Sequence, residues 1–507
     1  MVTVVTVSVA LLAFAATAFD VAAQARRDHA VDTVGADRVY RVEAEHPTAL
    51  LAAVRAVDPD GTSMAVVRTT RPYLEQPVEL MAVDATRLAA VARWRGEDGV
   101  AAFAEALRPP VREQLRLGER IEVRARVSNL GPEQVRLSVQ ISVPGDPPRV
   151  VPLGTLREGV GTYRTDVPEC AVARCRLIGL VLGRTGAAGP FTATVAIERI
   201  TSDGEAVAAG LDEPDAWTAA GDGVTVTPGE ALTVEVDGGP GGDVLVGYRD
   251  VADALPAVLA GPAPAADARA GGFEFPGFAD RAEPFAVVGT AARLPRAGAR
   301  GLLVDLEYAV ASAERTVALS DSAFTYEVWA NENAPPDLAR RLAEAGLPVL
   351  AEESITASVE QLGRRAPALG FWLYLLAAAT AVALALGVVL LSGRIGVESR
   401  RYELAALRVS GVRAGWLRRA VLREQAALVG WPLVVGAVTG AAAAALMLPG
   451  IPLVEVGVLA GAPAYRPEIG ALPVAAAVTL LGLALVGWRA VALVRQATPE
   501  RLREGWQ

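Results

Sequence analysis

Four long apolar runs without a charged residue punctuate the chain. They occupy residues 1–19, 366–393, 425–454 and 470–488. A helix of about 20 residues crosses the hydrocarbon core of a bilayer, which is roughly 30 Å thick. The pattern therefore predicts four transmembrane helices, at residues 1–20, 369–392, 420–448 and 470–489.

The first apolar run has a second interpretation, as a signal peptide cleaved near Ala23, Gln24 and Ala25. A signal peptide normally begins with a basic segment, and no basic residue precedes this run. The pattern therefore favours a transmembrane helix over a signal peptide.

The polar segment between the first two runs is long enough for more than one hydrophobic core. Residues 21–110 mix alternating runs with helical spacing and predict one half of an α/β unit. Residues 111–260 hold short β-branched runs broken by Gly and Pro, which is typical of an antiparallel β-sandwich. A linker at residues 261–272 leads to residues 273–365, which return to α/β character. We expect the second α/β half to pair with the first, with the sandwich inserted between them.

Arginine gathers at one position between the apolar runs. Residues 394–423 hold eight arginines and only two acidic residues. Moving Arg to the bilayer centre costs about 2.5–3.5 kcal/mol, so short basic loops stay in the cytoplasm. We therefore predict a cytoplasmic loop at residues 393–419 and a cytoplasmic tail at residues 490–507. The large domain and a short loop at residues 449–469 then lie outside. The expected fold class is an α+β multi-pass protein of the plasma membrane with a large extracytoplasmic domain and both termini in the cytoplasm.

The basic loop has internal order. Leu404 and Leu407 fall on one helical face, and Ser410 and Gly411 end that helix, since glycine is the usual C-terminal stop. The short helix either docks against a partner or lies as an amphipathic helix on lipid headgroups. Glu424, at the start of the third span, either holds an arginine or is a carboxylate at headgroup level.

Ten positions in and after this loop form a motif. They are Arg401, Glu403, Leu404, Ala405, Leu407, Arg408, Gly411, Arg418, Glu424 and Gly430. The motif resembles the signature of FtsX-like and MacB-like ABC transporter permeases, in which R-x-E-[apolar]-A-x-[LM]-R-x-x-G precedes a basic helix, a Glu and a span with small residues. The resemblance covers roughly the last 140 residues. Elsewhere it rests on layout alone, because the external region of MacB-like permeases has a comparable α/β arrangement.

The resemblance implies how the chain would work. In this family the short helix contacts a separate ABC ATPase. The ATPase-coupling residues would then be Arg401, Glu403, Leu404, Leu407, Arg408 and Gly411. Larger relatives carry two such repeats in one chain. A second FtsX-like unit is therefore expected, either a homodimer partner or the other half of a split permease.

Composition narrows the function further. The net charge is -9, and all 48 basic residues are arginine. A Walker A loop needs a lysine that reaches the phosphates, so any ATP hydrolysis must belong to another polypeptide. The acidic balance argues against nucleic acid as a partner. His29 and His46 are too few for a histidine-based metal or triad site, and we expect both at the surface. No cofactor, metal or enzymatic activity of its own is expected, and the lysine-free, alanine-rich composition is typical of an actinobacterial genome.

The two cysteines, Cys170 and Cys175, fall in the segment predicted to be extracytoplasmic, where disulfides persist. Closing so small a loop is worth roughly 2 kcal/mol in the chain-entropy model. A metal site is the weaker interpretation, because two cysteines without a nearby histidine cannot complete a tetrahedron.

The function expected from this pattern is transmission of motion rather than conduction. No apolar run carries a row of charges that would line a pathway. The leading hypothesis is the permease subunit of an FtsX-type ABC transporter, working with an ATPase and membrane lipids. The alternatives are a membrane-bound regulator of a cell-wall hydrolase driven by the same kind of ATPase, and a non-transporting receptor or adhesin. The cargo, if any, is not encoded in a recognisable pattern.

Overall fold

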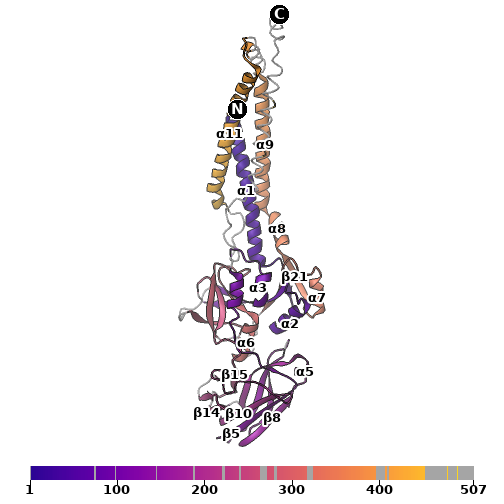
Figure 1. Cartoon of the computed structure of the whole chain (residues 1–507), viewed down its shortest axis with the longest axis vertical. Coiled ribbons are helices and arrows are strands. Elements are labelled where there is room, and N and C mark those ends of the chain that lie inside the picture. Colours follow the sequence, from indigo (N-terminus) through magenta and orange to yellow (C-terminus); the bar gives the residue numbers. More distant parts are fainter. Residues whose placement is uncertain are drawn as a thin grey trace. The chain divides into compact units, whose positions relative to one another are not determined.

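The computed structural model describes residues 2–451, with gaps at residues 74–75, 97–98, 144, 187–188, 220–222, 239–240, 263–270, 279–281, 317–323, 396–402, 404–405 and 408–409. Beyond residue 451 it describes only Ala477 and Trp488. The chain divides into two compact units (Figure 1). One contains Met1–Ala30 with Thr356–Gln507, and the other is Val31–Ile355.

Helices α1 (Val2–Val34), α9 (Ala366–Ile395) and α11 (Ala414–Met447) dominate the first unit. Among the described residues, three helical stretches are long and apolar enough to cross a membrane, within Val2–Val34, Ala368–Val389 and Gly430–Gly450. The chain is therefore of mixed α and β structure with helices of membrane-spanning length. The fourth predicted span, at residues 470–489, lies outside the described residues apart from Ala477 and Trp488.

Small and apolar side chains pack these three helices together. Val5 of α1, Ala385 of α9 and Leu433 of α11 form one buried cluster. The Ser8 hydroxyl donates a 3.0 Å hydrogen bond to the Ala381 carbonyl oxygen, which joins α1 to α9. A second cluster combines four residues of α1 with one of α9 and two from the end of α11 and the turn after it. Its members are Ala18, Val21, Ala22, Ala25, Phe371, Ala444 and Leu448.

The outward surface of α9 and α11 is strongly apolar. Leu373, Leu376, Leu384, Trp431 and Val438 are each more than 60% exposed. Side chains of this kind are costly against water and favourable against lipid. The exposed surface thus has the chemistry of a lipid-facing one.

Helix α1 is longer than the apolar pattern predicts. The predicted helix stops at residue 20, whereas α1 continues to Val34. Residues 21–34 contain no glycine or proline and include four alanines, so nothing in them breaks a helix that has already formed. The helix ends where Gly35 adopts a left-handed φ of 82°, the usual role of a glycine after a helix.

A nine-stranded mixed sheet organises the second unit. Its order is β17-β18-β16-β19-β3-β2-β20-β1-β21. The strands before the insertion are β1 (Arg38–Val42), β2 (Ser63–Tyr73) and β3 (Gln76–Val83). Those after it are β16 (Leu255–Ala260), β17 (Gly272–Pro276), β18 (Ala282–Ala291), β19 (Gly301–Asp305), β20 (Thr325–Ala330) and β21 (Val349–Ser354). The two chain segments thus build one sheet, through the parallel pair β3–β19 and the antiparallel pair β2–β20.

Helices cover both faces of this sheet. The helices of the domain are α2 (Pro47–Val57), α3 (Ala85–Val91), α4 (Val100–Ala106), α6 (Leu306–Thr316) and α7 (Leu338–Glu344). On one face Leu50 of α2, Ala309 of α6 and Leu342 of α7 belong to one core cluster. On the other face Leu88 of α3 is buried, with Phe103 of α4 packed against the same cluster. Two apolar layers therefore enclose the sheet.

The inserted domain is a β-sandwich of two antiparallel sheets. One sheet has the order β13-β14-β10-β5-β8 with β11 paired to β10, and the other has β12-β15-β9-β6-β7 with β4 paired to β9. The elements are β4 (Arg116–Leu117), β5 (Arg120–Ser128), β6 (Val135–Ser142), β7 (Arg149–Thr155), β8 (Gly159–Asp166), α5 (Cys170–Ala173), β9 (Cys175–Arg184), β10 (Thr192–Ser202), β11 (Glu205–Ala206), β12 (Trp217–Ala219), β13 (Val224–Thr227), β14 (Leu232–Asp237) and β15 (Val244–Tyr248). Inward-facing residues of both sheets, such as Val123 and Ile141, form a single core. Helix α6 contacts both this sandwich and the nine-stranded sheet, because Gln140 of β6 donates a 3.1 Å hydrogen bond to the Glu314 carbonyl oxygen (Figure 1).

The predicted C-terminal boundary of the sandwich is wrong. The predicted sandwich runs to residue 260, but β16 lies inside the nine-stranded sheet, between β18 and β19. All six residues of β16 are buried, which suits a strand covered on both faces and not one with a solvent side. The predicted linker at residues 261–272 overlaps β17 at Gly272, and residues 263–270 of it lie outside the described residues.

Candidate functional site

The two connections between the sheet and the apolar helices meet on neighbouring strands. Strand β1 follows α1 after three residues, and β21 leads directly into α8 (Ile355–Gly363) and then α9. The strands β1 and β21 are antiparallel partners, with Arg38 opposite Ser354. The Ile355 amide also donates a 3.2 Å hydrogen bond to the Asp37 carbonyl oxygen. The chain therefore enters and leaves this domain at one edge of its sheet.

Arg296 fixes the last turn of α1 to this edge. Its backbone amide donates to the Asp32 carbonyl oxygen at 2.8 Å, and its guanidinium donates to the Thr33 carbonyl oxygen at 3.2 Å. The same Nη1 donates to the Glu353 carboxylate on β21 at 2.7 Å. A cation at the C-terminus of a helix satisfies free carbonyls and complements the helix dipole. Arg296 thus joins the end of α1 to the strand that leads to α9.

Glu327 of β20 fixes the guanidinium of Arg296 from the sheet. It accepts hydrogen bonds from Arg296 Nε at 2.9 Å, from Arg68 Nη1 at 3.1 Å and from the Trp329 indole at 2.9 Å. Arg68 is paired in turn with Glu79 at 2.8 Å. Glu327 has no exposed surface, so removing one partner would leave buried charge poorly compensated. The network therefore favours one rigid geometry.

The ion pair between Arg296 and Glu353 stabilises the charged form of both side chains. The hydrogen bond from Arg296 lowers the pKa of Glu353 below its ordinary value and so favours the ionised carboxylate. Burial works to lower the pKa of Arg296, but Glu353 and Glu327 together raise it. Both partners remain charged at neutral pH.

Two further arginines pair with acidic residues in the last turn of α1 and just before β1. Arg95 pairs with Asp32 at 2.7 Å, and Arg93 pairs with Asp37 at 2.7 Å. The Arg93 amide also donates to the Gly35 carbonyl oxygen at 2.8 Å. We call the set of residues Asp32, Gly35, Asp37, Arg296 and Glu353 the junction.

The predicted coupling residues are only partly described. Arg401, Leu404 and Arg408 lie outside the described residues. Glu403 and Leu407 are helical and exposed. Gly411 has a φ of 91°, and the Val412 amide donates to the Leu407 carbonyl oxygen at 3.2 Å, which is the bond of a glycine-ended helix. Glu424 lies within α11, which begins at Ala414, six residues before the predicted third span.

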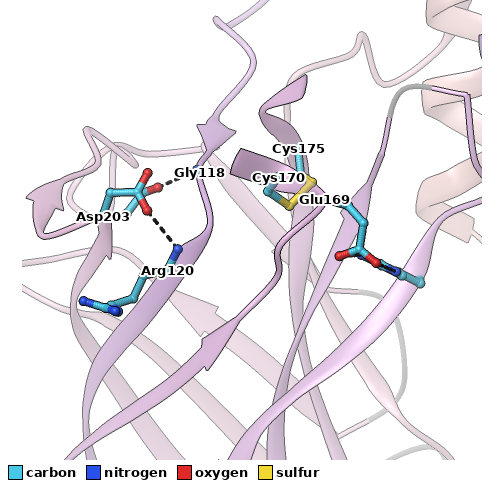
Figure 2. The surroundings of a disulfide bond; sticks show 8 residues. Gly118, Arg120, Glu169, Cys170, Cys175 and Asp203 are labelled. Atoms are coloured by element: carbon cyan, nitrogen blue, oxygen red, sulfur yellow. Dashed lines mark hydrogen bonds and ion pairs between the residues drawn. A yellow bond between two sulfur atoms is a disulfide. The ribbon is translucent and has the colours of Figure 1, made fainter. Parts of the chain in front are cut away.

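Cys170 and Cys175 form a disulfide inside the sandwich. Both side chains are fully buried in the sandwich core. Figure 2 shows the bond between α5 and the start of β9, beside the Glu169 carboxylate, which pairs with Arg149 at 2.8 Å. Nearby, the Asp203 carboxylate accepts a 2.8 Å hydrogen bond from the Arg120 amide (Figure 2). The disulfide is therefore part of the core and not a reactive surface group.

The expectation of two surface histidines is wrong for His46, which is 5% exposed. It is the N-cap of α2, and its Nδ1 accepts a 3.2 Å hydrogen bond from the Thr48 amide. Its neighbour Pro47 is buried too, so the cap faces the protein interior. In the described part of the chain, no three His, Cys, Asp or Glu side chains gather into a metal-binding group.

The sequence matches no protein-family model and no curated protein. The candidate site is therefore argued from the contacts and distances of its residues. The residues that build the junction carry no local sequence signal, because Arg296 meets Thr33 and Glu353 only after the chain has folded. The polar C-terminal part of α1 followed by Gly35 is the local sequence signal that marks where this helix ends.

Proposed function

We propose that this chain is the permease subunit of an ABC transporter of the FtsX type, which passes motion from a cytoplasmic ATPase to an extracytoplasmic domain. The junction is the observation that carries this proposal. One unbroken helix, α1, leads from an apolar segment to Val34, where Arg296 joins its final turn to β21.

The junction suits the transmission of force. A helix is stiff along its axis because every turn is hydrogen-bonded to the next. Displacing α1 along its axis relative to α9 would shear β1 against β21, and these strands are direct neighbours. The buried Arg296–Glu327 pair opposes local yielding, so the displacement would reach the sheet as a whole.

The topology that we propose follows from the arginine distribution. Four spans, with the segment at residues 393–419 and both termini in the cytoplasm, would put Glu403, Leu407 and Gly411 where an ATPase can reach them. The glycine-ended turn at Gly411 supports a short separate helix ahead of α11. The absence of lysine supports a separate ATPase subunit.

The assembly that we propose contains two FtsX-like units and two ATPase subunits. The second unit is either another copy of this chain or the other half of a split permease. An arrangement with two levers suits two ATPase subunits that close on ATP, since each would push one short helix. Whether a cargo crosses or leaves the membrane is not part of this proposal.

Co-purification tests the proposed partnership. The double variant Arg408→Glu with Leu404→Ala, made in the full chain, is expected to lower recovery of the ABC ATPase encoded beside this gene by about tenfold or more, since it reverses one charge and removes an apolar contact. Arg164→Glu, which makes the same charge change on the exposed surface of β8, is the matched control and should leave recovery unchanged.

Equal recovery of the ATPase with all three proteins would contradict the permease and favour a receptor or adhesin. Recovery of a cell-wall hydrolase with the external domain, with the ATPase still bound, would favour the regulator instead. In that case the junction would serve the same mechanical purpose for a different output.

A further inference from the structure

A cavity of about 200 Å³ lies between α2, α6 and the β-sandwich. Leu51 of α2 and Leu306 and Val310 of α6 form an apolar wall, and the sandwich contributes Arg116 and Arg176. The cavity is therefore shared by the two domains of the second unit. Such a position, with one apolar wall and a few convergent polar groups, is characteristic of small-molecule sites.

Arg176 is the most informative residue of the cavity, because it is buried without complete hydrogen bonding. Its residue exposure is 7%, and neither Nε nor Nη2 has a hydrogen-bond partner within the described structure. Two carboxylates approach it, Asp250 at 3.4 Å and Glu314 at 3.2 Å, but they do so as ion pairs without hydrogen-bond geometry. Buried donors that lack an aligned acceptor are costly and are uncommon in native proteins.

The two carboxylates beside this guanidinium are themselves buried. Burial raises the pKa of Asp250 and also that of Glu314, so both bind a proton more readily than an exposed carboxylate. Glu314 also accepts a 3.1 Å hydrogen bond from the Ser142 hydroxyl, which uses part of its acceptor capacity. Neither carboxylate therefore satisfies the Nε and Nη2 donors of Arg176.

The other arginines differ in how far they are compensated. Arg55 makes a bidentate contact with Asp84, at 2.9 and 3.0 Å. Arg116 has the Gln114 side-chain oxygen at 2.5 Å as its hydrogen-bond partner and forms no ion pair within the described residues. The two guanidinium groups from the sandwich thus supply donors for one further acceptor, while Arg55 is already satisfied.

We propose that this cavity binds a small amphiphilic anion, whose carboxylate or phosphate head is held by Arg176 and Arg116 and whose apolar body lies against Leu51, Leu306 and Val310. Guanidinium groups match such heads because their planar N–H donors fit two oxygens at once. Sites for drug-sized ligands measure about 300–1,000 Å³, so the smaller volume indicates a single ring or a short acyl chain.

Occupation of the cavity would connect the two domains. Leu51, Leu306 and Val310 belong to the body built on the nine-stranded sheet, whereas Arg116 and Arg176 belong to the sandwich. A ligand that contacts both stabilises the arrangement in which both walls are close. Ligand binding would therefore hold the sandwich against the body built on the nine-stranded sheet, independently of any movement of the apolar helices.

Calorimetric titration of the purified full chain with matched probes tests this proposal. The probes are 4-phenylbutyrate, 4-phenylbutyl phosphate and the uncharged 4-phenylbutanol, which share the apolar body. At least one of the two anions is expected to bind, and the alcohol to bind about tenfold or more weakly, because it cannot accept charge-assisted hydrogen bonds. The two anions distinguish a carboxylate ligand from a phosphate ligand.

Two variants locate the binding. Ala52→Trp fills the cavity from an exposed position of α2 and should abolish binding, and Arg116→Gln should weaken it about tenfold. Arg164→Gln removes an exposed arginine of β8 and is the matched control, expected to bind as the natural sequence does. Equal binding of the alcohol, unchanged binding by Ala52→Trp, or no binding of either anion at millimolar concentration would each overturn the proposal.

Discussion

Arg296 connects three segments that are far apart in the sequence. It contacts Thr33 at the end of α1, Glu327 on β20 and Glu353 on β21. Its own backbone has a φ of 62°, which non-glycine residues seldom adopt. Such a conformation persists only where the surroundings determine it, and here the hydrogen bond from the Arg296 amide to the Asp32 carbonyl oxygen and the three side-chain contacts do so. The residue is therefore a positioning residue for α1.

Replacing Arg296 with Gln is expected to loosen the end of α1. The change removes one partner of a buried ion pair, which typically costs about 3 kcal/mol or more, and frees the Thr33 carbonyl. Hydrogen exchange of the peptide containing residues 31–37 should speed up in the full chain. Arg300→Gln, an exposed neighbour, is the control and should change neither stability nor exchange. The same exchange rate in both variants would refute the anchoring role.

His46 makes the domain acid-sensitive. Burial lowers the pKa of His46 to about 4, whereas an unfolded chain protonates near pH 6.5. The unfolded state therefore binds more protons in this range, and stability is lost as the pH falls from about 6.5 to about 4. At pH 5 the loss from this group is about 2 kcal/mol relative to neutral pH.

The variant His46→Asn separates this effect from other titrations. Asparagine is a good N-cap and should still accept the bond from the Thr48 amide, but it does not titrate in this range. Chemical unfolding of the full chain at pH 7 and pH 5 should show a smaller difference for the variant. An unaltered difference would assign the acid sensitivity elsewhere.

At the scale of elements, the contact between α1 and α11 depends on two glycines. A Cβ atom at Gly436 would lie 2.7 Å from the Thr6 carbonyl oxygen, and one at Gly440 would lie 2.3 Å from that of Ala10. Backbone atoms cannot swing aside, so the two helices could not approach as closely. At Gly430 of the same helix, which belongs to the ten-residue motif, a Cβ would meet nothing within 4 Å. Gly436 and Gly440 therefore pack against α1, whereas Gly430 does not.

Gly440→Ala should destabilise the helix bundle, whereas Gly430→Ala should not. The first substitution forces α1 and α11 apart, and overpacking of this kind costs about 1–3 kcal/mol. The second only removes backbone freedom and is neutral or stabilising by up to about 1 kcal/mol. Unfolding in mixed micelles with increasing SDS measures both. Equal destabilisation by the two changes would mean that α1 and α11 do not pack in this way.

Sequence patterns predict these elements unevenly, for physical reasons. The apolar runs locate α1, α9 and α11, since burial in lipid demands uncharged residues whatever the tertiary fold. An edge strand such as β8, with the sequence GVGTYRTD, is hard to recognise within the predicted sandwich, because it needs no apolar alternation. The end of α1 was placed too early, because the change from apolar to polar residues marks a membrane boundary and not a helix end. The junction could not be predicted, since its partners are separated by hundreds of residues.

At the scale of the whole molecule, the sandwich is an insertion within one sheet. Strand β3 precedes it, and β3's parallel neighbour β19 follows it. The alternation of helix and strand signals before and after the β-rich region predicts such a split domain. The assignment of β16 to the sandwich was the error, because a strand of six apolar or small residues reads alike in either context. Its partners β18 and β19 decide the matter only in three dimensions.

The position of the two ends of the sandwich has a consequence for biosynthesis. Arg116 pairs with Arg176 in the register of β4 and β9, and Asp250 contacts the same Arg176, so both ends of the insertion meet at one residue. A newly made sandwich that has already closed would hold its flanking segments together and shorten the loop that must close between β3 and β19 from more than 200 residues to about 80, namely residues 84–115 and 251–300. Because the sandwich is synthesised before β19, its early folding on the ribosome would bring β3 close to the segment that β19 later joins.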